Sequence, residues 1–169
     1  MRRVLQRLDR AHERLLETVR PLDSGTFTER PSENEWSVGE IVQHLCLVEE
    51  RVLKELEAAM KREPRPVNWK RRLIPTSIVS LRLLRVKAPK AMNPVSVREK
   101  AQTIQNFDDV RARLKAFCGN ESVARLRQLN FKHPFLGEID GVATVSFVGY
   151  HEQRHFKQIR EVLKKLGKA

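Results

Sequence analysis

The stretch from Val142 to Leu163, VATVSFVGYHEQRHFKQIREVL, has the pattern of one long amphipathic helix near the end of the chain. Val148, His155 and Ile159 follow the three-then-four spacing of an apolar seam. His151 precedes His155 by four residues, so both imidazoles lie on one side of the helix, one turn apart. A buried imidazole needs partners for its ring nitrogens, because leaving them unpaired costs about 1–3 kcal/mol. Two such rings on one seam therefore indicate a metal site.

The composition is that of a helix-rich globular protein. The chain has 169 residues, of which 32% are charged and 40% hydrophobic, with only 7 Gly. This length suits one domain spanning residues 1–169. No apolar run is long enough to cross a bilayer, and the N-terminus lacks the apolar core of a secretion signal. We therefore expect a cytoplasmic protein without a membrane span.

The net charge of +12 is concentrated in one segment. Residues 61–90 contain ten Lys or Arg and one acid, Glu63, whereas the rest of the chain has 23 basic and 20 acidic residues. A local excess argues against a protein covered in basic surface for nucleic acid. The two cysteines have no CxxC spacing, and we expect both as reduced, buried thiols.

A strong helix start lies at residues 36–41, WSVGEI. Ser37 as N-cap and Glu40 three residues later form a capping box, and Trp36 with Ile41 can close a hydrophobic staple over it. The helix that begins here is expected to run to about Arg62. Capping gives Glu40 a structural role, which argues against a role as catalytic acid.

His44 lies at the edge of the inner face of this helix and is the third candidate ligand. Arg51 follows two turns later on nearly the same side and is a candidate to bind an anionic substrate group. Cys46 points to nearly the opposite side from His44. Glu152 is turned about 100° from His151 around its helix. Because HExxH is absent, the sequence excludes a zinc protease of that type.

Two further amphipathic helices complete the expected bundle. The first covers residues 3–19 and places His12 on its apolar stripe, where a hydrogen-bonded core histidine is the favoured interpretation. The other covers residues 97–117, with Arg111 beside Val110 on its inner face. Cys118-Gly119-Asn120 is a typical stop for this helix. Four long helices joined in this way predict an all-α four-helix bundle.

The connections carry further candidates. Residues 67–94 form a long crossover with a short helix expected near 76–86. This crossover is either packed by its own leucines, which is the favoured alternative, or acts as a lid, a membrane-surface segment or a dock for an acidic partner. The run from His133 to Gly137 is expected as a rigid turn, with Asp140 capping the last helix. His133 either anchors this turn, which is favoured, or reaches the mouth of the site.

Three imidazoles from two helices leave coordination positions open on a metal ion, which is typical of a reactive site and not of a closed structural one. Imidazole ligands suit Zn, Ni, Fe and Cu, so the residues do not select the metal. Gln158 lies two turns after His151 and is a candidate to orient a bound ligand or to hydrogen-bond a ligating histidine. The residues alone leave open that the histidines are structural.

Three blocks in this order resemble the DinB-like (DinB/YfiT) metalloprotein superfamily, over about residues 3–166. They are Trp36-Ser37 leading into His44-Leu45, the HisProxxGly turn from His133 to Gly137, and His151-xxx-His155-xx-Gln158-Ile159. The resemblance implies a four-helix bundle, often dimeric, in which a histidine of the second helix and the HxxxH pair of the last bind a divalent ion. Carried over, the ligands are His44, His151 and His155, and the ion is Zn or Ni, with Fe as a further option.

Members of this family include thiol-dependent transferases and isomerases that use low-molecular-weight thiols. The resemblance therefore implies a metal-dependent thiol transferase or hydrolase acting on a small electrophilic molecule, in a homodimer. Arg51 and Gln158 are its expected substrate-binding residues. The alternative is a non-enzymatic helical-bundle binding protein whose basic segment, residues 61–90, docks to nucleic acid or to an acidic partner.

Overall fold

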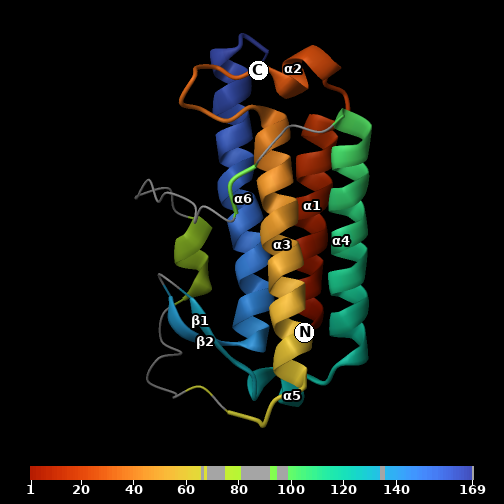
Figure 1. Cartoon of the computed structure of the whole chain (residues 1–169), viewed down its shortest axis with the longest axis vertical. Helices are drawn as coiled ribbons and strands as arrows, with labels where there is room; N and C mark the ends of the chain where they lie inside the picture. Colours follow the sequence, from red (N-terminus) through yellow and green to blue (C-terminus); the bar gives the residue numbers. More distant parts are fainter. Residues whose placement is uncertain (66, 68–74, 81–91, 95–98, 134–135, 169) are drawn as a thin grey trace.

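Four long helices pack side by side in the computed structural model (Figure 1). The structure describes residues 1–65, 67, 75–80, 92–94, 99–133 and 136–168. The long helices are α1 (Arg2–Val19), α3 (Val38–Met60), α4 (Lys100–Asn120) and α6 (Gly141–Lys165). In Figure 1, α1 and α6 run upward while α3 and α4 both run downward, so the chain must return along the bundle between α3 and α4. The predicted all-α four-helix bundle with a long crossover is confirmed.

The shorter elements lie at the ends and along one side of the bundle (Figure 1). They are helices α2 (Ser24–Thr28) and α5 (Val123–Arg127), the 3-10 helix η2 (Thr76–Ser80), and strands β1 (Asn130–His133) and β2 (Gly137–Asp140). The helix expected near 76–86 is represented by η2, and residues 81–86 lie outside the described part of the chain. Most of the basic segment 61–90 also lies outside it.

The predicted caps fix where α3 and α6 begin. Ser37 Oγ accepts a hydrogen bond from the Glu40 amide at 3.2 Å, and the Ser37 amide donates to Glu40 Oε2 at 2.8 Å. Asp140 Oδ1 accepts from the Ala143 amide at 2.8 Å. Each cap satisfies an amide that has no partner inside its helix. The starts of both helices that carry candidate ligands are therefore encoded locally.

The run from His133 to Gly137 joins the two strands of an antiparallel hairpin, in which Asn130 pairs with Asp140. We expected a rigid turn here, but no strands. Four-residue strands are too short to show a clear alternating pattern, so sequence periodicity does not reveal them. Gly137 adopts φ +69°, a conformation that favours glycine. The hairpin packs beside the first turns of α6.

Two expected helix ends differ from the structure. The helix expected at 97–117 begins at Lys100 and ends at Asn120, so it ends at the predicted stop Cys118-Gly119-Asn120 but includes those three residues. Gly119 stays helical, and the chain becomes extended only at Glu121, with φ −110° and ψ 141°. The linker after α1 contains α2, whose N-cap Asp23 accepts from the Thr26 amide at 2.8 Å.

The bundle core consists of two apolar clusters with a polar layer between them. One cluster contains Leu8, Leu53, Leu114 and Val148 among others; the second contains Leu15, Leu45, Phe107 and Ile159 among others. The polar layer is formed by one buried residue from each long helix, namely His12, Glu49, Arg111 and Glu152. Along each helix the polar residue lies between the apolar residues of the two clusters. The core is thus divided at mid-height.

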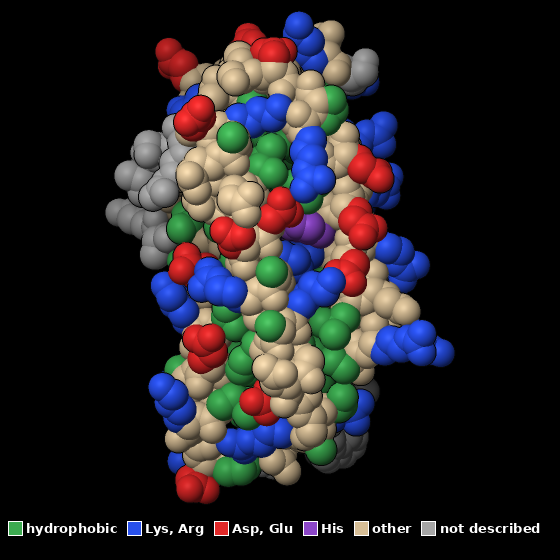
Figure 2. All heavy atoms as spheres, turned by 90° about the vertical axis from the view of Figure 1, so that its right-hand side faces the viewer, with side chains coloured by type: hydrophobic (Ala, Val, Ile, Leu, Met, Phe, Trp, Pro, Cys, Tyr) green, Lys and Arg blue, Asp and Glu red, His purple; other side chains and the backbone are tan. Residues whose placement is uncertain are grey.

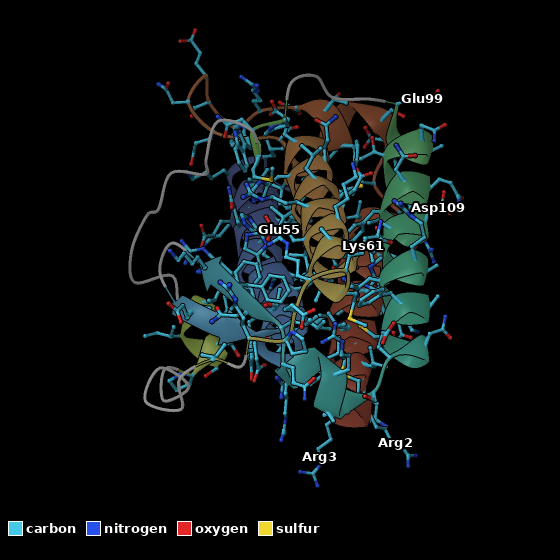
Figure 3. All side chains as sticks on the ribbon, turned by 60° about the horizontal axis from the view of Figure 1, so that its bottom comes forward. Arg2, Arg3, Glu55, Lys61, Glu99 and Asp109 are labelled. Atoms are coloured by element: carbon cyan, nitrogen blue, oxygen red, sulfur yellow. The ribbon has the colours of Figure 1, made fainter. Side chains whose placement is uncertain are left out.

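Charged side chains of both signs are interspersed on the face shown in Figure 2. Figure 3 shows Arg2 and Arg3 pointing away from the bundle at the start of α1, and Asp109 on the outer side of α4. Among the described residues, no helix is both long enough and apolar enough to cross a membrane.

Candidate metal centre

The structure brings the three predicted ligands together between α3 and α6. One candidate ligand nitrogen from each of His44, His151 and His155 lies within 4.8 Å of the others. The ring of His44 lies 5.2 Å from that of His151 and 4.8 Å from that of His155, and the last two rings are 4.5 Å apart between centroids. His44 and His155 are buried, whereas His151 is partly exposed. The cluster has a donor set that could hold a metal ion.

A backbone carbonyl fixes the tautomer of His44. Its Nδ1 lies 2.7 Å from the carbonyl oxygen of Met92, which can only accept, so Nδ1 carries the proton. The lone pair of His44 is then on Nε2. Ligating histidines in proteins commonly donate their other ring N–H to a carbonyl or carboxylate, which orients the ring. The geometry of His44 follows this pattern.

Gln158 pairs with His155 in the same manner. His155 Nδ1 lies 2.9 Å from Gln158 Oε1, while His155 Nε2 lies 3.2 Å from His151 Nε2. With Nδ1 as the donor to the amide oxygen, His155 Nε2 carries a lone pair aimed at the other imidazole. Without a cation, His151 Nε2–H can donate to this lone pair, and with a cation both Nε2 atoms can share it. Gln158 therefore orients a candidate ligand, which is one of the two roles expected for it.

Aromatic rings surround the cluster. Trp36 lies 5.0 Å from the His44 ring, and Phe147 stacks on the His151 ring at 5.2 Å. His133 makes an edge contact with Phe147, with ring centroids 4.6 Å apart, and its Nδ1 accepts the Leu136 amide at 3.1 Å. His133 thus anchors the hairpin turn, as favoured from the sequence. The aromatic surroundings lower the local polarity at the histidines.

Burial favours the neutral form of two of the three imidazoles, His44 and His151. It lowers the pKa of His44, and the Met92 carbonyl offsets only part of this effect. For His151, burial together with the neighbouring His155 and His44 holds the pKa well below its ordinary value of 6.5. Neutral imidazole is the form that coordinates a metal. The lone pairs are therefore available at neutral pH.

The residues that we excluded as ligands have other contacts. Glu40 completes the α3 cap and also pairs with Arg30. Cys46 is only partly buried, and its Sγ lies 3.6 Å from the Asn106 carbonyl on α4. Cys118 is the fully buried thiol, and burial raises its pKa to about 12. Neither cysteine is within the histidine cluster.

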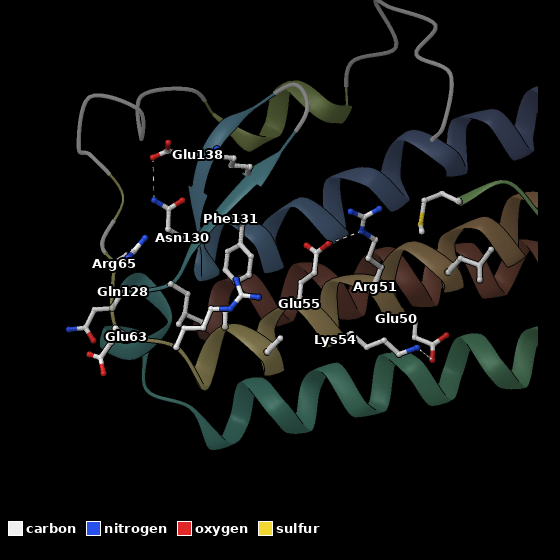
Figure 4. Close-up of a pocket in the computed structure, with 17 residues that line it drawn as sticks. Glu50, Arg51, Lys54, Glu55, Glu63, Arg65, Gln128, Asn130, Phe131 and Glu138 are labelled. Atoms are coloured by element: carbon white, nitrogen blue, oxygen red, sulfur yellow. Dashed lines mark hydrogen bonds and ion pairs between the residues drawn. The ribbon is translucent and has the colours of Figure 1, made fainter. Parts of the chain in front are cut away.

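An open groove of about 1250 Å³ runs along the outer side of α3, facing the hairpin and the segment that follows α3 (Figure 4). Arg51 lines this groove, where its Nε donates to Glu55 Oε1 at 2.7 Å (Figure 4). Phe131 of β1 also lines the groove. Met92, whose carbonyl accepts from His44, lies at the groove as well. The groove and the histidine cluster thus share Met92 as a common border.

The sequence did not reveal the polar layer as a network. Arg111 donates from Nε and Nη2 to the two carboxylate oxygens of Glu49, at 2.7 and 2.9 Å, and from Nη2 to Glu152 Oε2 at 2.9 Å. Its Nη1 donates to the Leu8 carbonyl at 2.7 Å. His12 Nε2 lies 2.7 Å from Asp108 Oδ1, as expected for a hydrogen-bonded core histidine.

The charges in this layer depend on one another. Burial alone would lower the pKa of the Arg111 guanidinium, but Glu152 and Glu49 raise that pKa above its usual value. Arg111 therefore remains charged. A partial signal was present in the sequence, because His12 and Arg111 lie at predicted inner-face positions of their helices. Which of these residues pair was not predictable, since the partners of Arg111 are 41 to 103 residues away.

The sequence profile of the DinB superfamily matches residues 7–159. The match covers most of the chain and both helices that carry the histidine cluster. The chain belongs to the DinB superfamily. The chain is also similar to the uncharacterized protein YuaE of Bacillus subtilis (strain 168), with 28% identity over 157 residues, 89% of this chain and 91% of YuaE. The resemblance inferred from the sequence is confirmed.

Two solved structures share the DinB-type bundle. YfiT from Bacillus subtilis, described as a probable metal-dependent hydrolase with an unusual four-helix bundle topology, superimposes with a TM-score of 0.68 at 13% identity. That match covers 99% of this chain and 87% of YfiT. TT2238, a four-helix bundle protein, matches with a TM-score of 0.62 at 19% identity, over 94% of this chain and 97% of TT2238. At these identities the similarity establishes the fold.

Proposed function

We propose that this DinB superfamily protein is a metal-dependent enzyme that acts on an electrophilic small molecule, with His44, His151 and His155 as the metal ligands. The observation that carries the proposal is the convergence of three imidazoles whose ligand nitrogens lie within 4.8 Å of one another. The description of YfiT as a probable metal-dependent hydrolase supports the same class of chemistry. Zn and Ni are the expected ions, with Fe as a further option.

The donor set fits a divalent ion. His44 and His155 each have Nδ1 hydrogen-bonded, to Met92 O and Gln158 Oε1, which leaves Nε2 for coordination. The depressed pKa of His44 and His151 keeps those rings neutral, so a cation meets no charged imidazolium. A divalent ion held by three neutral nitrogens has open positions and lowers the pKa of a coordinated water or thiol. The low-polarity walls at Trp36 and Phe147 strengthen electrostatic interactions within the site.

The groove beside Met92 is the proposed path for the substrate. Arg51 lines it, and we propose that its guanidinium binds a carboxylate of the substrate. A substrate carboxylate can replace Glu55 as the partner of Arg51 with little loss of stability, because the Arg51–Glu55 pair is exposed and contributes little to stability. The nucleophile is water in a hydrolase and a low-molecular-weight thiol in a transferase. A cytoplasmic homodimer is the proposed setting.

Metal analysis tests the first part of the proposal. Purified protein loaded with Zn²⁺ or Ni²⁺ and freed of excess ion should retain about one ion per chain by elemental analysis. His44→Ala, His151→Ala and His155→Ala should each lose most of this metal, because each removes one of three ligands. His133→Ala is the matched control, since His133 anchors the hairpin turn and is outside the ligand cluster. A folded wild-type protein that retains no metal would contradict the proposal.

An activity screen tests the second part. Metal-loaded protein is assayed with activated esters and amides, and in parallel with several cellular thiols and electrophiles. Hydrolysis that disappears in His155→Ala supports a hydrolase, whereas thiol-dependent product that disappears in the same variant supports a transferase. Metal binding without either reaction would remove the catalytic claim and leave a metal-binding protein.

A further inference from the structure

The guanidinium of Arg111 connects the two helices that carry the candidate ligands. Glu49 lies on α3, five residues after His44, and Glu152 lies on α6, immediately after His151. Arg111 lies on α4 and hydrogen-bonds both carboxylates at 2.7–2.9 Å. Arg111 is 3% exposed, and each glutamate is 1% exposed. A single side chain from a third helix thus joins α3 and α6 at the level of the histidine cluster.

The geometry of this connection restricts how the helices can move. Apolar contacts above and below the polar layer are non-directional, so they tolerate small rotations of α6 about its axis. The hydrogen bonds from Arg111 are directional, and the pair with Glu49 is bidentate. A rotation or slide of α6 that moves Glu152 away from Arg111 displaces His151 and His155, which lie one and three residues from Glu152 on the same rigid helix.

We infer that Arg111, with Glu49 and Glu152, is a positioning cluster that sets the approach of His44 to His151 and His155. Arg111 is not among the candidate ligands, so it acts through α3 and α6. The inference rests on the proposed metal centre for its functional meaning. Its structural content, the spacing of the three imidazoles, can also be measured in the metal-free protein.

Two variants separate positioning from stability. Removing Arg111 alone leaves two carboxylates buried without their cation, which destabilises a protein strongly. The triple variant Glu49→Leu/Arg111→Met/Glu152→Leu replaces the whole cluster with apolar side chains of similar volume, and such replacements are often neutral or stabilising. Glu152→Gln is the milder second variant, because it weakens only the hydrogen bond between Arg111 and α6.

Leu114→Ala is the matched control. Leu114 is fully buried, also lies on α4, one turn from Arg111, and belongs to an apolar cluster. Its truncation creates a cavity and destabilises the bundle without breaking the connection between α3 and α6. If metal affinity followed stability alone, this variant would lose affinity as much as the cluster variants do.

Each protein is titrated with Co²⁺, whose d–d absorption reports ligand geometry, and its unfolding is followed by circular dichroism. In the metal-free state, NMR detects contacts between the ring protons of His44 and those of His151 and His155, whose centroids lie 5.2 and 4.8 Å away. We expect the triple variant to stay folded, lose these contacts, bind Co²⁺ at least about tenfold more weakly and show an altered d–d spectrum. Glu152→Gln should change in the same direction, and Leu114→Ala should keep wild-type affinity and contacts.

Wild-type ring contacts and wild-type Co²⁺ affinity in the triple variant would overturn the inference, because apolar packing would then suffice. If the triple variant does not fold, wild-type ring contacts and wild-type Co²⁺ affinity in folded Glu152→Gln would overturn the inference. A wild-type protein that binds no Co²⁺, Zn²⁺ or Ni²⁺ would instead remove the proposed function. In that case the ring contacts of the metal-free variants still decide whether Arg111 positions the histidines.

Discussion

At the scale of single residues, the two ring nitrogens differ in role in two of the three candidate ligands. In His44 and His155, Nδ1 pairs with Met92 O and with Gln158 Oε1, and Nε2 remains for coordination. The ring orientation is thereby set before any ion binds, which reduces the cost of ordering the site on binding. Burial lowers the pKa of His44, because a neutral ring suits a buried cluster better than a charged one.

The depressed pKa of His151 predicts a pH dependence of stability in the metal-free protein. Above the ordinary pKa of about 6.5 the ring is neutral in both folded and unfolded chains and adds no pH dependence. As the pH falls below this value, the unfolded chain takes up a proton that the folded chain excludes. The free energy of unfolding therefore falls until the pH reaches the folded pKa, by at most about 1.4 kcal/mol per pH unit.

Comparison with His151→Gln isolates this effect from other titrating groups. The difference in unfolding free energy, wild type minus variant, should decrease as the pH is lowered from about 7.5 to about 5. Urea denaturation of both metal-free proteins at several pH values measures it. Parallel curves over this range would show that His151 titrates alike in the folded and unfolded chains.

At the scale of elements, the start of α3 determines where His44 lies, seven residues after the N-cap. Ser37→Ala removes the acceptor for the Glu40 amide, and we expect it to cost about 1 kcal/mol, within the usual range of about 0.5–2 kcal/mol. Chemical denaturation measures the loss. Ser24→Ala is the control: Ser24 is exposed, and its side chain makes no hydrogen bond with the described residues, so its effect should stay within about 0.5 kcal/mol. Equal effects of the two substitutions would argue against a stabilising cap.

At the scale of the whole molecule, α5 and the first turn of α6 pack with almost no space between their backbones. A Cβ at Gly141 would lie 2.7 Å from the Leu126 carbonyl oxygen, which cannot move without its helix. We expect Gly141→Ala to destabilise the protein by about 1–3 kcal/mol. Gly119→Ala is the matched control, because its Cβ meets nothing within 4 Å, and in a helix it should stabilise by about 0.5–1 kcal/mol. Thermal unfolding of both variants tests this, and a Gly141→Ala protein as stable as Gly119→Ala would contradict the packing argument.

The sequence predicted the four long helices well because helix signals are local. The capping box at Ser37 and the cap at Asp140 involve residues three positions apart, and the apolar seams repeat every three or four residues. The C-terminal end of α4 was predicted less well, since Gly119 remains helical where a glycine stop was expected. The hairpin from Asn130 to Asp140 was missed because its pairing is decided across the turn and against α6.

The candidate site was likewise predictable from the sequence only in part. His44, His151 and His155 were identified because each lies on or beside an inner face that the spacing of apolar residues reveals. Gln158 was placed on the correct side for the same reason. The Met92 carbonyl that orients His44, and the link from Arg111 to Glu49 and Glu152, join segments 41 to 62 residues apart. Helical periodicity carries no information about such pairs.

The sequence by itself determined which residues form helices, where α3 and α6 begin, and which side of each helix carries imidazoles, because these properties depend on neighbours within about one turn. Only the tertiary structure decided that the HxxxH pair on α6 meets His44 on α3 and that Arg111 joins the same two helices from α4. Those contacts depend on the direction, rotation and register of whole helices. These are fixed by the packing of the entire core, with the buried cluster of Arg111, Glu49 and Glu152 at its middle.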